Sequence, residues 1–85
     1  TDYEFVAIVV ENSKNGMAKV EMRNRFKVGE QLELLSKQKN NAIITIEQIL
    51  DDKGQSLPEC KIPKQIVAIK TNLDLKKFEI LRRKK

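Results

Sequence analysis

The most informative absence in this 85-residue chain is histidine, of which it has none. A Ser-His-Asp or Cys-His nucleophile system therefore cannot be built from this chain. A tetrahedral zinc site or an iron–sulfur cluster needs several His or Cys ligands, and Cys60 is the single cysteine. The three glycines, Gly16, Gly29 and Gly54, stand far apart, so no glycine-rich phosphate loop is present. We therefore expect no catalytic residues, no metal, no cofactor and no enzymatic activity in this chain by itself.

Long apolar runs are also missing. No run approaches the ~20 residues that a membrane-spanning helix needs, so we expect no membrane partner. One cysteine cannot form an intrachain disulfide, which fits a reducing compartment and favours a cytoplasmic location. Thr1 stands where an initiator methionine would be, and strand-like residues begin at Phe5. We expect residues 1–85 to form one domain, excised from a longer protein.

Carboxylate pairs remain as candidates for acid–base chemistry. Asp51 and Asp52 precede Gly54, a pattern more typical of a turn than of a catalytic or metal-binding pair. Glu30 and Glu33 straddle the predicted start of a strand and point to opposite faces, which disfavours a dyad. An autonomous peptidase is therefore disfavoured.

Alternating apolar residues predict an all-β fold. The alternation is clearest where Ala18, Val20 and Met22 alternate with charged residues, and where Leu32 and Leu34 follow the same rule. The other predicted strands lie in residues 5–11, 42–49, 65–71 and 78–83. Turn residues separate these segments, which indicates a barrel or a sandwich, and we favour a small antiparallel β-barrel of about six strands.

Local signals refine this prediction. Asn15 and Gly16 supply the positive φ angles of a tight hairpin. The apolar phase slips by one residue near Gln48, which predicts a β-bulge. Pro58 and Pro63 bracket a stretch that is unlikely to be a central strand.

One segment leaves two interpretations open. Residues 73–83 could form a single amphipathic helix, but Phe78 and Ile80 are spaced by two, which favours a strand. The chain has four aromatic residues, and we expect most of them to be in the core: Tyr3, Phe5, Phe26 and Phe78.

Phe26 receives a more specific prediction. We expect it to be buried beside Val28 and Leu32, closing one end of the barrel. The order of elements around it, a strand, a basic corner, a Val-Gly-Glu turn and a second strand, is similar to that of the small barrels found as the second domain of translation elongation factors.

Basic residues exceed acidic ones by 17 to 12, a formal net charge of +5. Such an excess can indicate binding to nucleic acid or another acidic partner, but a plain solvated surface is the favoured interpretation. Arg23, Arg25 and Lys27 share one strand parity, so we expect them to project together from the corner. The C-terminal run is a second candidate for phosphate contact, or simply a disordered charged terminus: Arg82, Arg83, Lys84 and Lys85.

Five segments in order resemble the C-terminal domain of the collagenase-like peptidase family U32. They are residues 3–6 (Tyr-Glu-Phe-Val), 20–26 (Val-Glu-Met-Arg-Asn-Arg-Phe), 28–34 (Val-Gly-Glu-Gln-Leu-Glu-Leu), 63–67 (Pro-Lys-Gln-Ile-Val) and 78–83 (Phe-Glu-Ile-Leu-Arg-Arg). Glu30 stands where the family usually has Asp. The resemblance covers roughly residues 3–83.

The resemblance implies a small β-barrel appended to a larger N-terminal catalytic domain, which holds the catalytic and cluster-binding residues of the family. Members are described as peptidases, some as collagenases, and relatives hydroxylate ribosomal or transfer RNA. We therefore expect a non-catalytic accessory domain whose partner is that N-terminal domain, engaging a peptide substrate or acting as a lid. The alternative is an RNA-binding barrel using Arg23, Arg25, Lys27, Arg82 and Arg83, with weak, sequence-tolerant binding centred on the first three.

Overall fold

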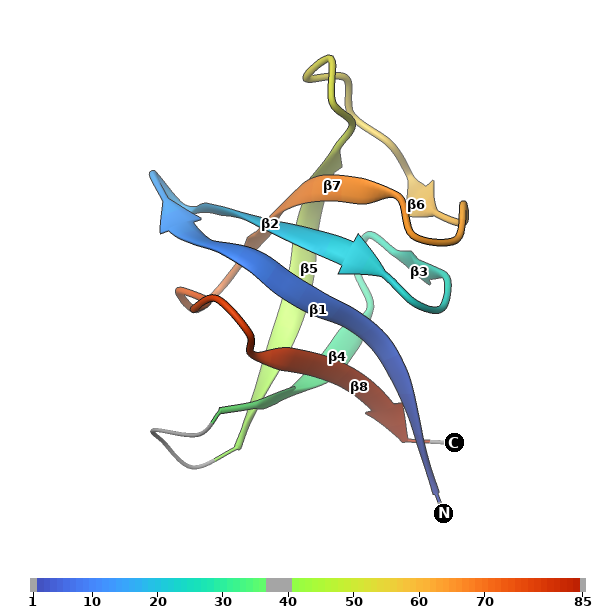
Figure 1. Cartoon of the computed structure of the whole chain (residues 1–85), viewed down its shortest axis with the longest axis vertical. Helices are drawn as coiled ribbons and strands as arrows, with labels where there is room; N and C mark the ends of the chain where they lie inside the picture. The colour runs from blue at the N-terminus through green and yellow to red at the C-terminus, as the bar shows by residue number, and fades with distance from the viewer. Residues whose placement is uncertain (1, 37–40, 85) are drawn as a thin grey trace.

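The computed structural model describes residues 2–36 and 41–84, which form a closed barrel of six antiparallel strands (Figure 1). Around the barrel the order is β1, β2, β7, β5, β4 and β8, and β8 pairs with β1 to close it. A two-stranded ribbon of β3 and β6 stands outside that order. The strands are β1 (Tyr3–Lys14), β2 (Met17–Met22), β3 (Phe26–Lys27), β4 (Gln31–Leu35), β5 (Ala42–Leu50), β6 (Glu59–Cys60), β7 (Ile66–Thr71) and β8 (Ile80–Lys84). The predicted all-β barrel is confirmed.

The barrel interior is filled by the apolar residues that alternate along the strands. Ala18, Val20 and Met22 of β2 and Leu32 and Leu34 of β4 are each no more than 3% exposed, as the alternation predicts. The other strands contribute Val6, Val9, Ile44, Ile46, Ile49, Val67, Ile69 and Leu81. Burying one such side chain stabilises the fold by about 1.5–3 kcal/mol relative to leaving it exposed. No helix able to cross a membrane occurs among the described residues.

The turn and bulge signals are also confirmed. Asn15 and Gly16 have φ angles of 54° and 82° and join β1 to β2. The register of β5 against β7 shifts between Ile46 and Gln48, where the bulge was predicted. Between the two prolines, β6 has only two residues and pairs with β3 outside the barrel.

One end of the barrel is closed by Phe26, which is 1% exposed, with Leu32 in the same core cluster. The prediction is wrong for Val28, which is 40% exposed. Its amide donates to the carbonyl of Pro58 at 3.0 Å in the turn that leads to β4, and the side chain is left at the surface.

The connection between β7 and β8 contains a bend and a turn but no helix, so the helical interpretation of residues 73–83 is wrong and the strand is confirmed from Ile80 onward. Phe78, however, lies outside β8, has a positive φ of 75° and is 66% exposed. Leu75 and Leu81 fill the interior instead, each at most 1% exposed.

The expectation that most aromatic residues form the core is therefore wrong. Tyr3 and Phe5, at 39% and 58% exposed, also face outward, and Phe26 is the buried one of the four. The aliphatic side chains of the strands already fill the small interior of a six-stranded barrel.

Candidate functional site

The predicted basic corner lies where the chain leaves β2. This strand ends at Met22, and the chain bends at the next two residues, where the amide of Arg23 donates to the carbonyl of Val6 in β1 at 2.7 Å. The strand parity expected for Arg23, Arg25 and Lys27 is wrong, because no single strand runs through all three.

Phe26 holds the other side of the corner. It pairs with Cys60 in the two-stranded ribbon, and the next residue, Lys27, pairs with Glu59. Both Phe26 and Cys60 are buried, whereas Arg25 and Lys27 are exposed on either side of the phenyl ring. One inward aromatic thus places two cations at the surface.

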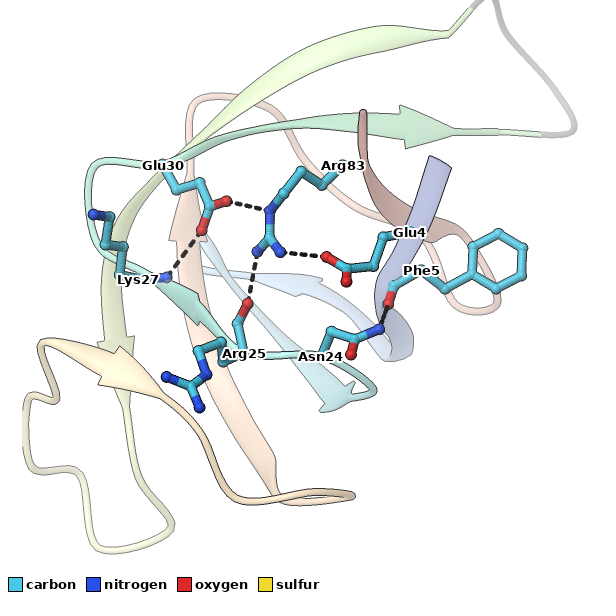
Figure 2. Close-up of polar contacts among 7 residues, drawn as sticks. All are labelled: Glu4, Phe5, Asn24, Arg25, Lys27, Glu30 and Arg83. Carbon is cyan, nitrogen blue, oxygen red and sulfur yellow. Dashed lines mark hydrogen bonds and ion pairs between the residues drawn. The ribbon is translucent and has the colours of Figure 1, made fainter. Parts of the chain in front are cut away.

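Arg83 is the hub of the polar contacts at this corner (Figure 2). Its Nε atom donates to the Glu30 carboxylate at 2.6 Å, and its two terminal nitrogens donate to Glu4 at 2.5 Å and to the carbonyl of Arg25 at 2.6 Å. Glu30 also accepts the amide of Lys27 at 3.2 Å. The side chain of Arg83 therefore ties β8 to β1, to the corner and to the start of β4.

The electrostatics of this cluster hold Arg83 in its charged form. Burial works against the charge, but the hydrogen bond and charge of Glu30, together with those of Glu4, outweigh it and raise the pKa of Arg83 above its ordinary value. All three guanidinium nitrogens are already engaged within the domain.

Two more arginines of the predicted surface are paired. Arg82 lies 2.6 Å from Glu33, and its guanidinium carbon is 3.7 Å from the centre of the Tyr3 ring. Arg23 lies 3.1 Å from Glu21, but at 50% side-chain exposure this contact is open to solvent. Half-exposed pairs of this kind contribute little, whereas the buried stem and ring contact of Arg82 add packing.

The structure corrects one interpretation of the C-terminal run, that of a disordered charged terminus. Arg82, Arg83 and Lys84 are the last residues of β8, so the two arginines belong to the barrel and not to a disordered terminus. Lys85 lies outside the described residues.

Two cations of the corner, Arg25 and Lys27, remain available to contact a partner. Neither side chain forms an ion pair with any residue in the described ranges. They line a surface hollow of about 290 Å³ together with Arg83, and the carboxylates of Glu30 and Glu59 share its wall. Of the five residues predicted to form this surface, Arg82 and Arg83 are held by carboxylates, Arg23 has a pair that is open to solvent, and Arg25 and Lys27 have no ion pair among the described residues.

A second polar surface lies on the opposite side of the barrel, where Figure 1 shows the β1–β2 turn near the β7–β8 connection. We call it the hairpin groove. It has a volume of about 720 Å³, and its wall includes Asn12, Lys14, Met17, Lys19, Ala68 and Lys77.

The sequence analysis missed this surface because it assigned Phe78 to the core. The signal that could have revealed it is the Lys76-Lys77-Phe78 triplet, two cations directly before an aromatic residue. A positive φ at a residue other than glycine costs of order 1–3 kcal/mol, so Phe78 is strained and yet exposed.

The aspartate pair of the sequence lies in a turn, where Asp51 binds the backbone. Asp51 accepts the amides of Lys53 and Gln55 at 2.9 Å each, so the predicted turn is confirmed. Among the described residues, no group of three His, Cys, Asp or Glu side chains is placed to hold a metal ion.

The model of the peptidase family U32 C-terminal domain matches residues 1–82. This chain belongs to that family. A crystal structure of the C-terminal domain of a Geobacillus thermoleovorans protein assigned to the U32 peptidases is 31% identical and superposes with a TM-score of 0.85. That match covers 94% of this chain and 99% of the other. A second crystal structure of that domain gives a TM-score of 0.84 over 96% of this chain and 92% of the other, again at 31% identity.

A curated relative adds a different kind of information. The Bacillus subtilis (strain 168) protein named tRNA hydroxylation protein P1 is 31% identical over 86 residues. The match covers all of this chain but only 20% of that protein. This chain therefore spans about a fifth of the length of the relative, and the family match assigns it to the C-terminal domain.

Proposed function

We propose that this chain is a non-catalytic RNA-contacting domain of a longer U32 protein that acts on tRNA. The observation that carries the proposal is the relative named for tRNA hydroxylation, which matches this chain from end to end. The net charge of +5 suits a polyanionic partner. Because the chain corresponds to a fifth of that relative, the proposal assigns binding to this domain and chemistry to the rest of the protein.

The residue inventory supports this division of labour. Without histidine, and with its one thiol buried, the chain has no nucleophile that histidine could assist. We propose that any peptidase or hydroxylase activity belongs to another domain of the parent protein. A cytoplasmic location, where tRNA is found, is part of the same proposal.

Binding by charge has a measurable signature. Each phosphate that is neutralised releases counterions, so affinity falls with salt with a logarithmic slope of about −0.7 per contact for single strands. Few phosphate contacts on a small domain should give weak binding that tolerates many sequences.

The test is titration of the purified chain with a fluorescent tRNA transcript at about 0.05 M and about 0.2 M salt. We expect saturable binding at the lower concentration and a clear loss at the higher one. No binding at low salt, with a folded protein by circular dichroism, would refute the proposal.

A second candidate function is docking on the preceding part of the parent protein, as a lid or to engage a substrate. The observation in its favour is an apolar hollow of about 340 Å³ on the outer face of β1 and β8, lined by Phe5, Ile8, Ile80 and Asn24 among others. Four-fifths of the curated relative lies outside the matched region, and that remainder is the occupant we propose.

The docking candidate has its own test in the full-length parent protein. Phe5→Asn should loosen the domain and speed protease cleavage between the two parts, because it removes an exposed apolar contact without touching the core. Leu73→Asn, at an exposed leucine on the β7–β8 connection, is the control. Equal cleavage rates for the two variants would exclude docking through this hollow, and loss of peptide binding instead would assign the hollow to substrate.

A further inference from the structure

We propose that the hairpin groove, bordered by the exposed ring of Phe78, is where this domain binds RNA, in place of the basic corner that the sequence indicates. The inference rests on the proposed function and assigns it a site. The groove would hold the phosphate backbone of a single-stranded segment, while Phe78 would stack on a base.

The lysines of the groove are free to meet phosphates. Lys14 and Lys77 form no ion pair with any residue of the described ranges. Lys19 lies 3.3 Å from Glu11, but both side chains are more than half exposed, so this ion pair is weak and easily exchanged. Glu11 is the one carboxylate among the residues that line the groove.

Strand register extends this positive surface along β7. Lys19 pairs with Ala68 and Met17 pairs with Lys70, so Lys70 comes two residues after the groove residue Ala68 on the outward face. Lys70 is exposed. A line of lysines at strand spacing matches a backbone that carries one charge per nucleotide.

Phe78 adds the aromatic surface that the corner lacks. Its ring is 66% exposed, and the Lys77 ammonium lies 5.1 Å from the ring centre. Because Lys77 also lines the groove, the ring lies at the groove's border. Aromatic rings beside a basic channel are how proteins hold single strands without reading sequence, since every base offers a flat face.

The backbone that carries the ring is held in place before any ligand arrives. The Phe78 amide donates to the carbonyl of Val9 at 2.8 Å, and the Lys77 amide donates to the side-chain oxygen of Asn12 at 2.6 Å. Leu75 anchors the same connection in the core at 1% exposure. A preorganised site loses less conformational entropy on binding. Backbone strain at an exposed aromatic therefore has a functional reason here.

The corner is the weaker candidate on the same criteria. Arg25 and Lys27 share their hollow with two carboxylates, and the one aromatic there, Phe26, is 1% exposed. An acidic peptide could also neutralise lysines, but it would gain nothing from the stacking face. We therefore favour RNA over an acidic protein as the occupant.

The experiment compares three double variants that each remove two positive charges. They are Lys14→Gln with Lys77→Gln in the groove, Arg25→Gln with Lys27→Gln at the corner, and Lys53→Gln with Lys61→Gln as a control at exposed sites that line neither hollow. Each is titrated with a tRNA transcript and a single-stranded oligoribonucleotide. We expect the groove variant to lose about 10- to 30-fold in affinity at about 0.1 M salt, and its salt slope to fall by about 1.4. The other two variants should lose less than about threefold.

Phe78→Asn separates stacking from charge, because it keeps the net charge and because Asn tolerates a positive φ. We expect affinity to fall at least about fivefold, while the melting temperature stays unchanged or rises. A purely structural role for Phe78 would not weaken binding in a protein of equal or greater stability.

Each other outcome has a definite meaning. If the corner variant loses affinity and the groove variant does not, the groove is excluded and the RNA-binding function stands. If all three double variants lose affinity equally, binding is a diffuse effect of net charge and no site exists. If polyglutamate competes as well as RNA, the groove serves acidic polymers in general. If the wild type binds no RNA at low salt, the proposed function fails together with its site.

Discussion

The two ends of the barrel carry positive charge in opposite ways. At the corner, Arg82 and Arg83 are partly buried and each meets a carboxylate at 2.6 Å. At the hairpin groove, Lys14 and Lys77 extend into solvent without ion pairs in the described part of the chain. Two arginines therefore strengthen the fold at the corner, beside the unpaired Arg25 and Lys27, whereas Lys14 and Lys77 at the groove remain available for a partner with one carboxylate nearby.

The choice of cation follows from this division. An arginine fork can meet two carboxylates and a carbonyl at once, as Arg83 does with Glu4, Glu30 and Arg25. Lysine is a mobile point charge, and little free energy is lost when its side chain stays solvated. The comparison teaches that a cluster of basic residues in a sequence is a poor guide to a binding surface until its carboxylate partners are known.

The largest effect that tests the comparison concerns two phenylalanines. Phe26→Ala at the corner should lower the free energy of unfolding by about 3–5 kcal/mol, because it empties a closed end of the core. Phe78→Ala at the groove should change it by less than about 0.5 kcal/mol. Urea unfolding of both variants is the measurement.

If Phe26→Ala does not fold, the milder variant Phe26→Leu replaces it, and we expect that variant to lower the free energy of unfolding by less than about 1.5 kcal/mol. Equal destabilisation by the two alanine variants would mean that Phe78 also supports the core, which would contradict its exposure.

The next effect concerns the hub of the corner. Arg83→Met should destabilise the domain by about 2 kcal/mol, because it leaves Glu4 and Glu30 partly buried without their partner. Lys84→Gln, one residue along the same strand and exposed, is the matched control and should have almost no effect. Indistinguishable urea midpoints for the two variants would show that the Arg83 contacts do not stabilise the corner.

A smaller difference is expected between two paired arginines. Arg82→Gln should lower the free energy of unfolding by about 1 kcal/mol, because it removes the contacts with Glu33 and the Tyr3 ring. Arg23→Gln should lower it by about 0–0.5 kcal/mol, because the pair with Glu21 is open to water. Thermal unfolding at low and high salt checks both, and the Arg82 effect should persist at high salt. A larger loss of stability for Arg23→Gln than for Arg82→Gln would contradict the expectation that the more buried ion pair contributes more.

The smallest effect is a pH dependence from Cys60. Burial raises the pKa of this thiol, more than the opposing hydrogen bond from the backbone near Ile62 lowers it. The thiol of the unfolded chain therefore loses its proton at a lower pH than the thiol of the folded chain. The stability that is present below the unfolded-state pKa is lost as pH rises toward the folded-state pKa.

Cys60→Ala isolates this contribution. The stability difference between wild type and variant should shrink between about pH 7 and about pH 10, a window that spans the ordinary thiol pKa. Because the two proteins differ only at residue 60, contributions from the rest of the chain cancel in this difference. A difference that is constant or grows over this window would show that burial does not raise the thiol pKa.

Much of the fold follows from local rules that the chain obeys. The alternation in β2 and β4, the Asn15-Gly16 turn and the bulge near Gln48 are each short-range features, and each is found as predicted. The predictions failed at Val28 and Phe78, where a turn hydrogen bond or a left-handed residue interrupts the period of two.

The candidate site was less predictable for a physical reason. Glu4 and Arg83 are 79 positions apart, and Lys14 and Lys77 are 63 apart, so no spacing rule links either pair. Only the closure of the barrel by β8 against β1 decides that the first pair meets and that the second pair shares a groove.

The amino-acid sequence by itself determined the class of fold, the absence of a histidine-based reaction centre and the membership in the U32 C-terminal family, because these depend on composition, on short-range periodicity and on ordered motifs. The tertiary structure alone decided which charges are neutralised and which remain free. Ion pairing depends on distances between strands that lie far apart in the chain, and in a closed barrel those distances are set by register.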